Sequence, residues 1–369
     1  MNLRKDKWKK VPLGNLCNVK RGDIITKKTI SEGNIPVIAS AVGITYYHNK
    51  ANRQGEIITV SASGVNAGFV NFFNEPIFAS DCTTIQPSSK EIDIRYVYNC
   101  LESLQGEIMG FQRGTAQAHV YPKDLIALEI PFPPLEEQKQ IAALFQSIET
   151  SMEQVDGQVH HLHKLKHKLL KDLFSEKQEF GNHLKAKDFE TVKFEKIAVN
   201  ISERVEPKKT ELTTYVGLEH LDADNLKIER TGTPDDVIGT KLKIYKGDII
   251  FGKRRAYLRK VAVSHFDGIA SAHSMILRAN EKNIEKDFLP YFMQSDTFMS
   301  RAVQISEGSL SPTIKNKTLA VQEFILPKKE KQKELISVLK QFDTTMEQLK
   351  QQKTTLKNLK QKLLNEILG

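Results

Sequence analysis

Two long stretches of the chain place apolar residues three and four positions apart. The first begins near Pro134 and the second near Lys328. This spacing keeps apolar side chains on one face of an α-helix, and runs of this length predict coiled-coil-like seams. Each helix is expected to span about 39 residues, or roughly 58 Å at the helical rise of ~1.5 Å per residue. The seam positions are Ile141, Leu144, Ile148, Met152, Val155, Val159, Leu162, Leu165, Leu169 and Leu173 in the first stretch, and Leu335, Val338, Phe342, Met346, Leu349, Leu356, Leu359, Leu363 and Ile367 in the second.

The start of the first helix carries further signals. Pro133 and Pro134 are expected in its first turn, where proline is tolerated. Glu136 and Glu137 follow, and acidic side chains are favourable at the positive end of the helix dipole. The second stretch has lost the double proline and the paired acids.

The two stretches are copies of each other. Residues 138–155 and 332–349 share six identities in eighteen positions at an offset of 194. The same offset relates 165–174 to 359–368, with five of ten residues identical. A shared register of this length indicates an internal duplication. The six identical residues, numbered in the first copy, are Gln138, Lys139, Thr150, Met152, Glu153 and Gln154.

The duplication extends more weakly into the segments before each helix. Gly114-Thr115 precedes Gly308-Ser309 by the same 194 positions, and Gly55 and Gly247 each begin a Gly-acid-Ile-Ile segment. Short runs rich in β-forming residues, separated by Gly, Asn and Ser, predict a curled and largely antiparallel sheet in each segment. Amphipathic helices are expected at matching places, 92–104 and 286–303.

These patterns predict an α+β chain with a pseudo-twofold internal repeat. Two tandem mixed domains are separated by two long helices that form an antiparallel coiled coil; in the alternative, each helix packs only on its own domain. The expected boundaries are 1–133 for domain 1, 134–178 for helix 1, 179–327 for domain 2 and 328–369 for helix 2.

Composition places the chain in a reducing compartment without membrane contact. No apolar run approaches the ~18 residues of a membrane span, and no secretory apolar stretch follows the basic N-terminal segment. Cys17, Cys82 and Cys100 are scattered and never in CxxC spacing, which argues against a disulfide framework. We therefore expect a cytoplasmic protein. The net charge of +9 and the pI near 9.1 suit either an acidic partner or a merely basic surface.

The two domains differ most in the loop after the Gly-acid-Ile-Ile segment. In domain 2 this loop packs cations around one tyrosine, a composition typical of surfaces that meet phosphates and base edges. In domain 1 it is polar and glycine-rich. A second pair of loops offers Arg and Gln, which read guanine and adenine, in one copy and serines in the other. A solvated basic hairpin is the alternative reading. The candidate DNA-binding residues are Lys253, Arg254, Arg255, Tyr257, Arg259, Lys260, Ser309 and Ser311 in domain 2, and Ser61, Ser63, Asn66, Arg113, Gln117 and His119 in domain 1.

Signals of catalysis or metal binding are weak. The chain has no GxxxxGK[ST], HExxH or GxSxG motif and no signature of a methyl-donor site. His160, His163 and His167 recur at helical spacing, but the second copy has no histidine there, which favours a solvated face over a metal site. We expect no catalytic residue, bound cofactor or metal. The best-preserved residues lie on the helices, so the duplication retains a contact with something common to both halves.

The chain resembles the specificity subunits of type I restriction–modification systems. The resemblance rests on the domain–helix–domain–helix order and on IPFPPLEEQ (130–138) at the start of the first helix. It also rests on GDIIFGKRRAYLRKVAV (247–263) followed by DGIASAHSMILR (267–278). It covers essentially the whole chain.

The resemblance implies two target recognition domains, each reading one half of a bipartite, asymmetric site in double-stranded DNA. The helices would set the spacer and dock two methyltransferase subunits, with two restriction/translocase subunits as optional partners. Adenine methylation and cleavage, with S-adenosylmethionine, ATP and Mg²⁺, would belong to those partners, in a prokaryotic cytoplasm beside the nucleoid. The alternatives are a specificity subunit of a type II enzyme, of the IIB or IIG kind, and a duplicated protein-interaction scaffold that does not touch DNA.

Overall fold

A computed structural model describes residues 3–26, 29–40, 42–114, 116–175, 177, 179–181 and 183–369. Thr115, one member of the repeated Gly-Thr pair, lies outside these residues. The chain forms two compact units. Unit 1 comprises residues 1–157 and 350–369, and unit 2 comprises residues 158–349.

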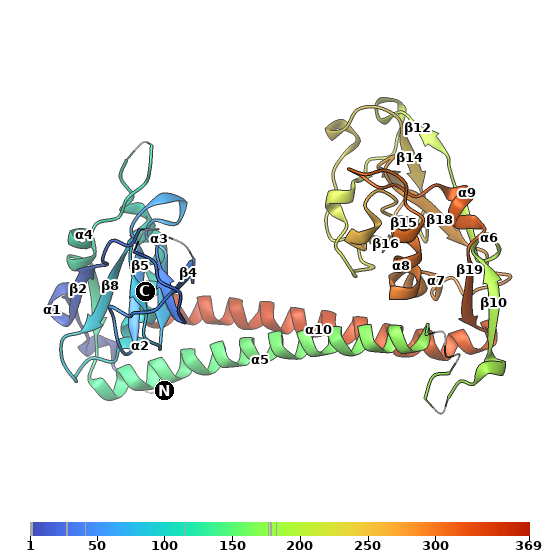
Figure 1. The fold of residues 1–369 in the computed structure, drawn as a ribbon. Coiled ribbons are helices and arrows are strands. Elements are labelled where there is room, and N and C mark those ends of the chain that lie inside the picture. The colour runs from blue at the N-terminus through green and yellow to red at the C-terminus, as the bar shows by residue number, and fades with distance from the viewer. Residues whose placement is uncertain are drawn as a thin grey trace. The chain divides into compact units, whose positions relative to one another are not determined.

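Unit 1 is built on a four-stranded antiparallel sheet in the order β2–β8–β5–β6 (Figure 1). A smaller sheet, β4–β3–β7, contains the parallel pair β3/β7, and β1 pairs with β9. The elements are η1 (Lys5–Lys7), β1 (Lys9–Pro12), α1 (Leu13–Leu16), β2 (Cys17–Arg21), β3 (Ile35–Ile38), β4 (Tyr46–His48), β5 (Ile57–Ser61), η2 (Gly64–Asn66), β6 (Val70–Phe73), β7 (Phe78–Ala79), β8 (Cys82–Pro87), α2 (Ile94–Ser103), α3 (Gln105–Gly110), α4 (Pro122–Ile126) and β9 (Glu129–Phe132).

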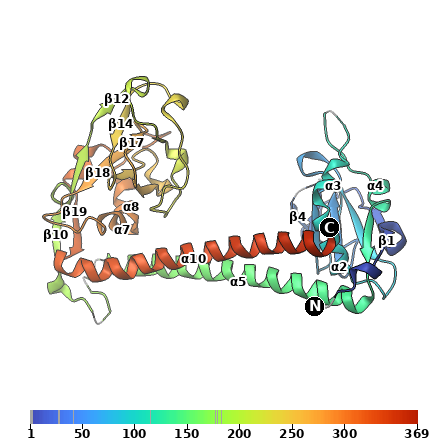
Figure 2. The same cartoon turned by 180° about the vertical axis from the view of Figure 1, so that it is seen from behind.

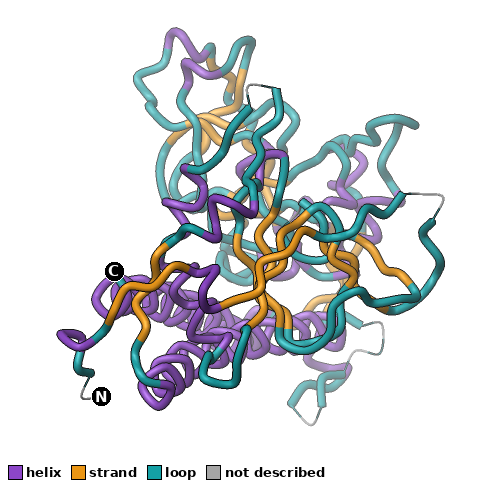
Figure 3. Tube along the Cα trace, turned by 90° about the vertical axis from the view of Figure 1, so that its left-hand side faces the viewer, coloured by secondary structure: helices purple, strands orange, loops and turns teal. Residues whose placement is uncertain are grey.

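Unit 2 repeats this plan with the sheet β11–β18–β15–β16. A second sheet, β12–β14–β17–β13, contains the parallel pair β13/β17, and β10 pairs with β19 (Figure 2). The elements are η3 (Ala186–Asp188), β10 (Phe189–Lys193), α6 (Phe194–Ile197), β11 (Ala198–Ile201), β12 (Arg204–Val205), η4 (Pro207–Lys209), β13 (Tyr215–Val216), η5 (Leu218–His220), η6 (Pro234–Asp236), β14 (Lys241–Ile244), β15 (Ile249–Phe251), η7 (Ala256–Leu258), β16 (Val261–Val263), β17 (Gly268–Ala270), β18 (Met275–Ala279), α7 (Leu289–Gln294), α8 (Asp296–Gln304), α9 (Asn316–Ala320) and β19 (Glu323–Pro327). The mixture of helix, strand and loop in Figure 3 confirms the predicted α+β class.

The two long helices are α5 (Leu135–Leu173) and α10 (Lys329–Leu368), and each contributes to both units. Within unit 1 they run antiparallel, because Lys360 pairs with Glu149 while Lys353, further back along α10, pairs with Asp156 further along α5. Within unit 2 the same pairing places Lys166 against Asp343. The predicted antiparallel pairing therefore holds in each unit.

The compact units do not end where the long helices begin. Each unit combines a globular domain with about half of both helices, and the four successive segments expected from the sequence remain a prediction. The prolines also precede α5 instead of forming its first turn. The Pro134 carbonyl accepts the backbone N–H groups of Glu137 and Gln138, which closes the first turn from outside.

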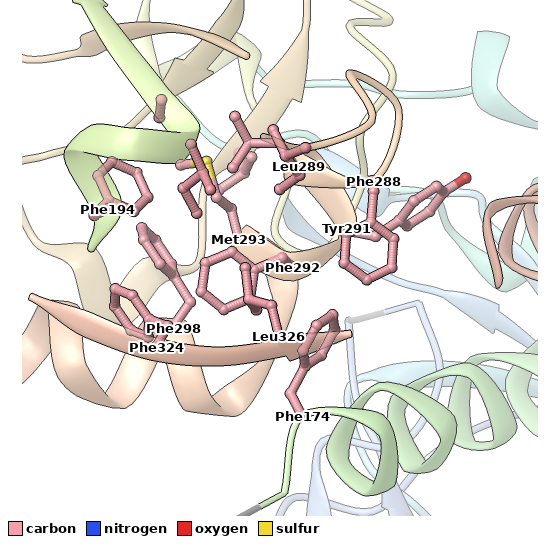
Figure 4. Close-up of a cluster of buried hydrophobic side chains, with 14 of the residues drawn as sticks. Phe174, Phe194, Phe288, Leu289, Tyr291, Phe292, Met293, Phe298, Phe324 and Leu326 are labelled. Atoms are coloured by element: carbon pink, nitrogen blue, oxygen red, sulfur yellow. The ribbon is translucent and has the colours of Figure 1, made fainter. Parts of the chain in front are cut away.

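A cluster of aromatic side chains lies within the core of unit 2 (Figure 4). Phe292 packs edge-on against Phe298 and Phe324, with ring centroids 5.5 and 5.0 Å away. Phe174, just past the end of α5, contacts Phe292 at 5.3 Å. The helix is thereby joined to the domain through a continuous apolar cluster. The core of unit 1 is mainly aliphatic and likewise includes α10 residues, among them Leu364.

Candidate nucleic-acid interface

Two loops meet side by side in unit 1. The first loop of unit 1, residues 62–69, joins β5 to β6, and the second loop, residues 111–121, joins α3 to α4. The Gly64 N–H donates to the Ala118 carbonyl at 2.9 Å, and the Val120 N–H donates to the Ala62 carbonyl at 3.0 Å. The second loop is closed at its base by two backbone hydrogen bonds between Arg113 and His119.

The same two loops meet in unit 2. Its first loop, residues 252–260, joins β15 to β16, and its second, residues 305–315, joins α8 to α9. The Arg255 N–H donates to the Pro312 carbonyl at 2.8 Å, and the Ile314 N–H donates to the Lys253 carbonyl at 3.0 Å. Two backbone hydrogen bonds between Glu307 and Thr313 close the second loop.

Backbone conformation in the first loops repeats as well. Gly64 and Gly68 have φ angles of 77° and 88°, and the equivalent positions in unit 2, Arg255 and Arg259, have 58° and 54°. Glycine adopts this left-handed conformation freely, whereas an L-residue with a side chain is destabilised there by about 1–2 kcal/mol. Two strained arginines on one short loop point to a use for their side chains.

The arginine and serine predicted in separate loops of unit 2 are in contact. The guanidinium of Arg254 donates to the Ser311 hydroxyl at 3.1 Å and lies 3.3 Å from Nε2 of His273. Burial, with the charges of Arg254 and Lys253 next, lowers the pKa of His273. Burial also lowers the pKa of Lys253. Cations crowded this closely create a positive potential that stabilises an incoming anion.

Three other predicted residues of unit 2 face solvent. Arg255 and Ser309 are exposed, and the ring of Tyr257 is 53% exposed. The Arg255 side chain has neither a hydrogen bond nor an ion pair with any residue that the structure describes. A cation and an aromatic ring held in the open beside the Arg254–Ser311 pair are suited to phosphate and base contacts.

Arg259 and Lys260 hold the loop from within. The Arg259 guanidinium pairs with Asp224 at 2.8 Å and Asp296 at 3.0 Å, and the Lys260 ammonium donates to the Leu218 carbonyl at 2.6 Å. Both were predicted to contact DNA. In this structure both side chains bond to residues of unit 2 and anchor the loop.

In unit 1 the candidate side chains lie mostly on the second loop. Arg113 and Gln117 are exposed; Arg113 pairs with Asp124 at 2.8 Å. His119 is half-buried and stacks on Tyr121 with ring centroids 6.2 Å apart. Asn66, half-buried on the first loop, donates to the Ser40 carbonyl at 3.5 Å.

Two predicted residues of unit 1 are not at the surface. Ser61 is 1% exposed within β5, and Ser63 is 3% exposed with its hydroxyl donating to the Asp81 carboxylate. The strand extends to Ser61 and the loop folds over Ser63, so neither side chain is available at the surface of this structure. Sequence reasoning in turn missed His273. It lies two residues after Ala270-Ser271, which match Ala79-Ser80 of unit 1 at an offset of 191.

Both helices are fastened to their domains by matching contacts. Gln138 Oε1 accepts the Asp93 N–H at 2.9 Å, and Gln332 Oε1 accepts the Glu285 N–H at 2.8 Å. Each Nε2 donates to a backbone carbonyl just before its helix. Both glutamines are fully buried. The identity of Gln138 and Gln332 between the two copies is therefore explained by these contacts within each unit.

A buried lysine forms a second matching contact. In unit 1, Lys360 lies 2.6 Å from both Glu102 and Glu149, and burial raises the pKa of Glu102 despite the opposing effect of Lys360. In unit 2, Lys166 lies 2.6 Å from Asp343 and 3.4 Å from the amide oxygen of Gln294. The amide of Gln294 in unit 2 thus corresponds to the carboxylate of Glu102 in unit 1.

One of the histidines of α5 makes a contact with the domain. His167 Nε2 is 3.2 Å from Asp296, on the side of the helix that faces the domain. Within the described residues, no group of three or more His, Cys, Asp or Glu side chains is placed to hold a metal ion. No helix among those residues combines the length and apolar character needed to cross a bilayer.

Two domains that share one loop framework and differ in its side chains define a duplicated recognition protein. The model of the type I restriction modification DNA specificity domain matches residues 5–158 and 186–358. The chain therefore belongs to this family. It is 26% identical over 328 residues to the type I restriction enzyme MjaVIII specificity subunit of Methanocaldococcus jannaschii, covering 83% of this chain and 76% of that protein. It is 22% identical to the EcoDI specificity subunit of Escherichia coli, covering 90% of this chain and 81% of that protein.

Solved structures share the fold. The crystal structure of a type I restriction–modification S subunit from Mycoplasma genitalium matches with a TM-score of 0.61 at 20% identity, covering 97% of this chain and 95% of that one. A chain from a structural study of type I system assembly and conformational transition matches with a TM-score of 0.59 at 16% identity, covering 97% of both chains.

Proposed function

We propose that the chain is the non-catalytic DNA specificity subunit of a type I restriction–modification enzyme. Each unit reads one half of a bipartite, asymmetric site through its two loops. The observation that carries the proposal is the conserved loop framework with exchanged side chains. Equivalent loop positions carry different side chains in the two units: Ser63, Gly64 and Gln117 in unit 1 correspond to Arg254, Arg255 and Ser311 in unit 2. The two halves therefore suit different base sequences.

In unit 2, Arg254, Arg255, Tyr257, Ser309 and Ser311 are the proposed contacts, with Lys253 contributing charge. In unit 1 they are Arg113, Gln117 and His119, with Asn66 at the margin. Arginine and lysine side chains supply position and affinity through phosphates, and the few polar side chains specify bases. The bases themselves are to be determined by experiment.

The helices are the proposed docking surface for two methyltransferase subunits. Three identities of the repeat are exposed in both copies: Lys139, Thr150 and Gln154 in α5, and Lys333, Thr344 and Gln348 in α10. Their spacing of eleven and four residues places them on one helix face. Unlike Gln138, they make no hydrogen bond or ion pair with the described residues that would explain their retention, whereas a common partner would explain it.

Catalysis, S-adenosylmethionine, ATP and Mg²⁺ belong to the partner subunits in this proposal, including restriction subunits where the system cleaves DNA. The proposal also includes a cytoplasmic location. Burial raises the pKa of all three cysteine thiols to about 12, so these thiols are protonated and unreactive at neutral pH.

Co-expression with a type I methyltransferase subunit from the source genome, followed by methylome sequencing, tests the proposal. We expect one bipartite adenine-methylated motif. Changing Arg254 and Arg255 together to alanine should abolish recognition of one half-site and leave assembly intact. Loss of assembly instead would mean that the loop is structural.

A salt titration separates DNA reading from a protein scaffold. Affinity of the complex for duplex DNA should fall steeply as salt rises, because phosphate contacts release counterions. An affinity that does not change with salt would contradict DNA binding.

A further inference from the structure

Leu310 is the most unusual exposed side chain of unit 2. It is 91% exposed, higher than any other large apolar residue described in this unit. It occupies the centre of the second loop, between Glu307 and Thr313, whose backbones are bonded to each other. Ser309 and Ser311 flank it, so the tip is one aliphatic group with small neighbours. A single exposed leucine is common on protein surfaces, so it is the position of Leu310, at a loop tip beside Arg254 and Arg255, that sets it apart.

The loop holds this tip firmly beside the basic cluster. Arg254 donates to the Ser311 hydroxyl at 3.1 Å, and the Arg255 N–H donates to the Pro312 carbonyl at 2.8 Å. These contacts flank the leucine on its C-terminal side. The Arg255 side chain, whose guanidinium has no partner among the described residues, also starts from this contact between the two loops. An aliphatic tip next to cations that have no acidic partner among the described residues suits a partner that is a polyanion outside and apolar inside.

Duplex DNA has this combination, since phosphates surround a stack of bases. Side chains such as leucine insert between base pairs, unstack them locally and kink the duplex. We propose that Leu310 is such a wedge and that it enters one base-pair step of the half-site read by unit 2. The inference rests on the proposed function and adds a specificity-determining residue, because pyrimidine–purine steps unstack most easily.

The second loop of unit 1 has no comparable side chain at its tip, so the proposed wedge acts on one half-site only. Ala116 occupies the position 194 residues before Leu310. A methyl group cannot separate two base pairs. The half-site read by unit 1 therefore remains stacked at the corresponding step, and the two halves of the site differ in deformability as well as in sequence.

The test uses the full chain in its methyltransferase complex and duplexes that carry the motif found by methylome sequencing. 2-Aminopurine, whose fluorescence rises when it unstacks, replaces each adenine of the unit 2 half-site in turn, except the methylated adenine, which the methyltransferase itself flips out of the stack. We expect a several-fold rise at one step with the wild type and with Leu310→Met. The rise should be lost with Leu310→Ala, whose affinity should fall about tenfold.

Val199→Ala is the matched control. Val199 is 47% exposed on β11 and pairs with Arg278, at the end of the sheet opposite to the first loop. It should behave as the wild type, and all variants should keep the wild-type melting temperature because neither residue is buried.

Two results would overturn the wedge. The first is an equal fluorescence rise with the wild type and Leu310→Ala, or no rise at any position with DNA bound. The second is that replacing one thymine by deoxyuridine weakens the wild type but not Leu310→Ala, without unstacking. Leu310 would then contact a thymine methyl group. Failure of the wild type to bind the motif would contradict the proposed function itself.

Discussion

Two arginines in left-handed backbone conformations serve different purposes. Arg259 uses its side chain within unit 2, bridging Asp224 and Asp296. Arg255 has no such partner among the described residues, yet it keeps the same strained conformation, with φ of 58°. Strain without an internal contact is expected where the side chain acts on a ligand.

Replacing Arg255 by glycine should therefore separate stability from binding. We expect unfolding free energy to rise by about 0.5–1 kcal/mol, since relief of the left-handed strain exceeds the added entropy of the unfolded chain. Affinity for the cognate half-site should fall at least tenfold. Denaturant titration and fluorescence anisotropy measure the two effects.

Arg259→Gly is the control for this experiment. It relieves the same backbone strain but leaves Asp224 and Asp296 without their cation, so it should lower the free energy of unfolding. If Arg255→Gly bound DNA as tightly as the wild type, Arg255 would not be a DNA contact.

At the scale of the element, the junction between helix and domain is polar in both units but differently charged. Lys360 in unit 1 faces two carboxylates, whereas Lys166 in unit 2 faces one carboxylate and an amide. Burial raises the pKa of Glu102, so the folded unit holds its proton more tightly than the unfolded chain does.

Glu102→Gln should stabilise unit 1 in a pH-dependent way. Above the raised pKa, Glu102 is ionised in both states and the folded state bears the desolvation penalty, which glutamine avoids. Below the unfolded pKa the wild type is protonated in both states, and the advantage disappears. The gain in unfolding free energy should therefore be largest near pH 7 and shrink towards pH 4.5, as denaturant titrations across this range will show. A gain independent of pH would contradict this origin.

The helix surfaces allow a test of each proposed docking face separately. Lys139→Glu with Gln154→Ala should weaken one methyltransferase contact, and Lys333→Glu with Gln348→Ala the other. Each pair should shift the complex from two methyltransferase subunits to one, as native mass spectrometry would record.

Gln140→Glu is the control for these pairs, because it introduces the residue of the second copy, Glu334, at an exposed site that the repeat has not kept identical. Its complex should keep two methyltransferase subunits. Two bound subunits in all the variants would place docking elsewhere.

At the scale of the whole molecule, the proposed spacer function concerns both helices together. Inserting four residues into each helix, within the matched register, adds about 6 Å at the helical rise. The methylated motif should then gain one or two base pairs of spacer, since each strand of B-DNA advances ~3.4 Å per step. Methylome sequencing of the variant provides the measurement. An unchanged spacer would show that the helices do not set the distance between the two half-sites.

Much of the molecule follows from periodicity in the sequence. The steps of three and four that begin near Ile141 determined both long helices, because a seam of that length is stable only as a buried helix face. The offset of 194 determined the duplication and indicated which loops correspond. Exposed loop residues such as Arg255 and Gln117 followed from residue type.

Only the tertiary structure decided which of the candidate side chains are available to a ligand. Ser61 and Ser63 looked polar and accessible, but the strand and its neighbouring loop cover them. Arg259 looked like a free cation, but acidic residues far away in sequence neutralise it. Periodicity is a local property that a sequence displays directly, whereas burial and charge pairing depend on residues brought together by long-range folding, which no local pattern encodes.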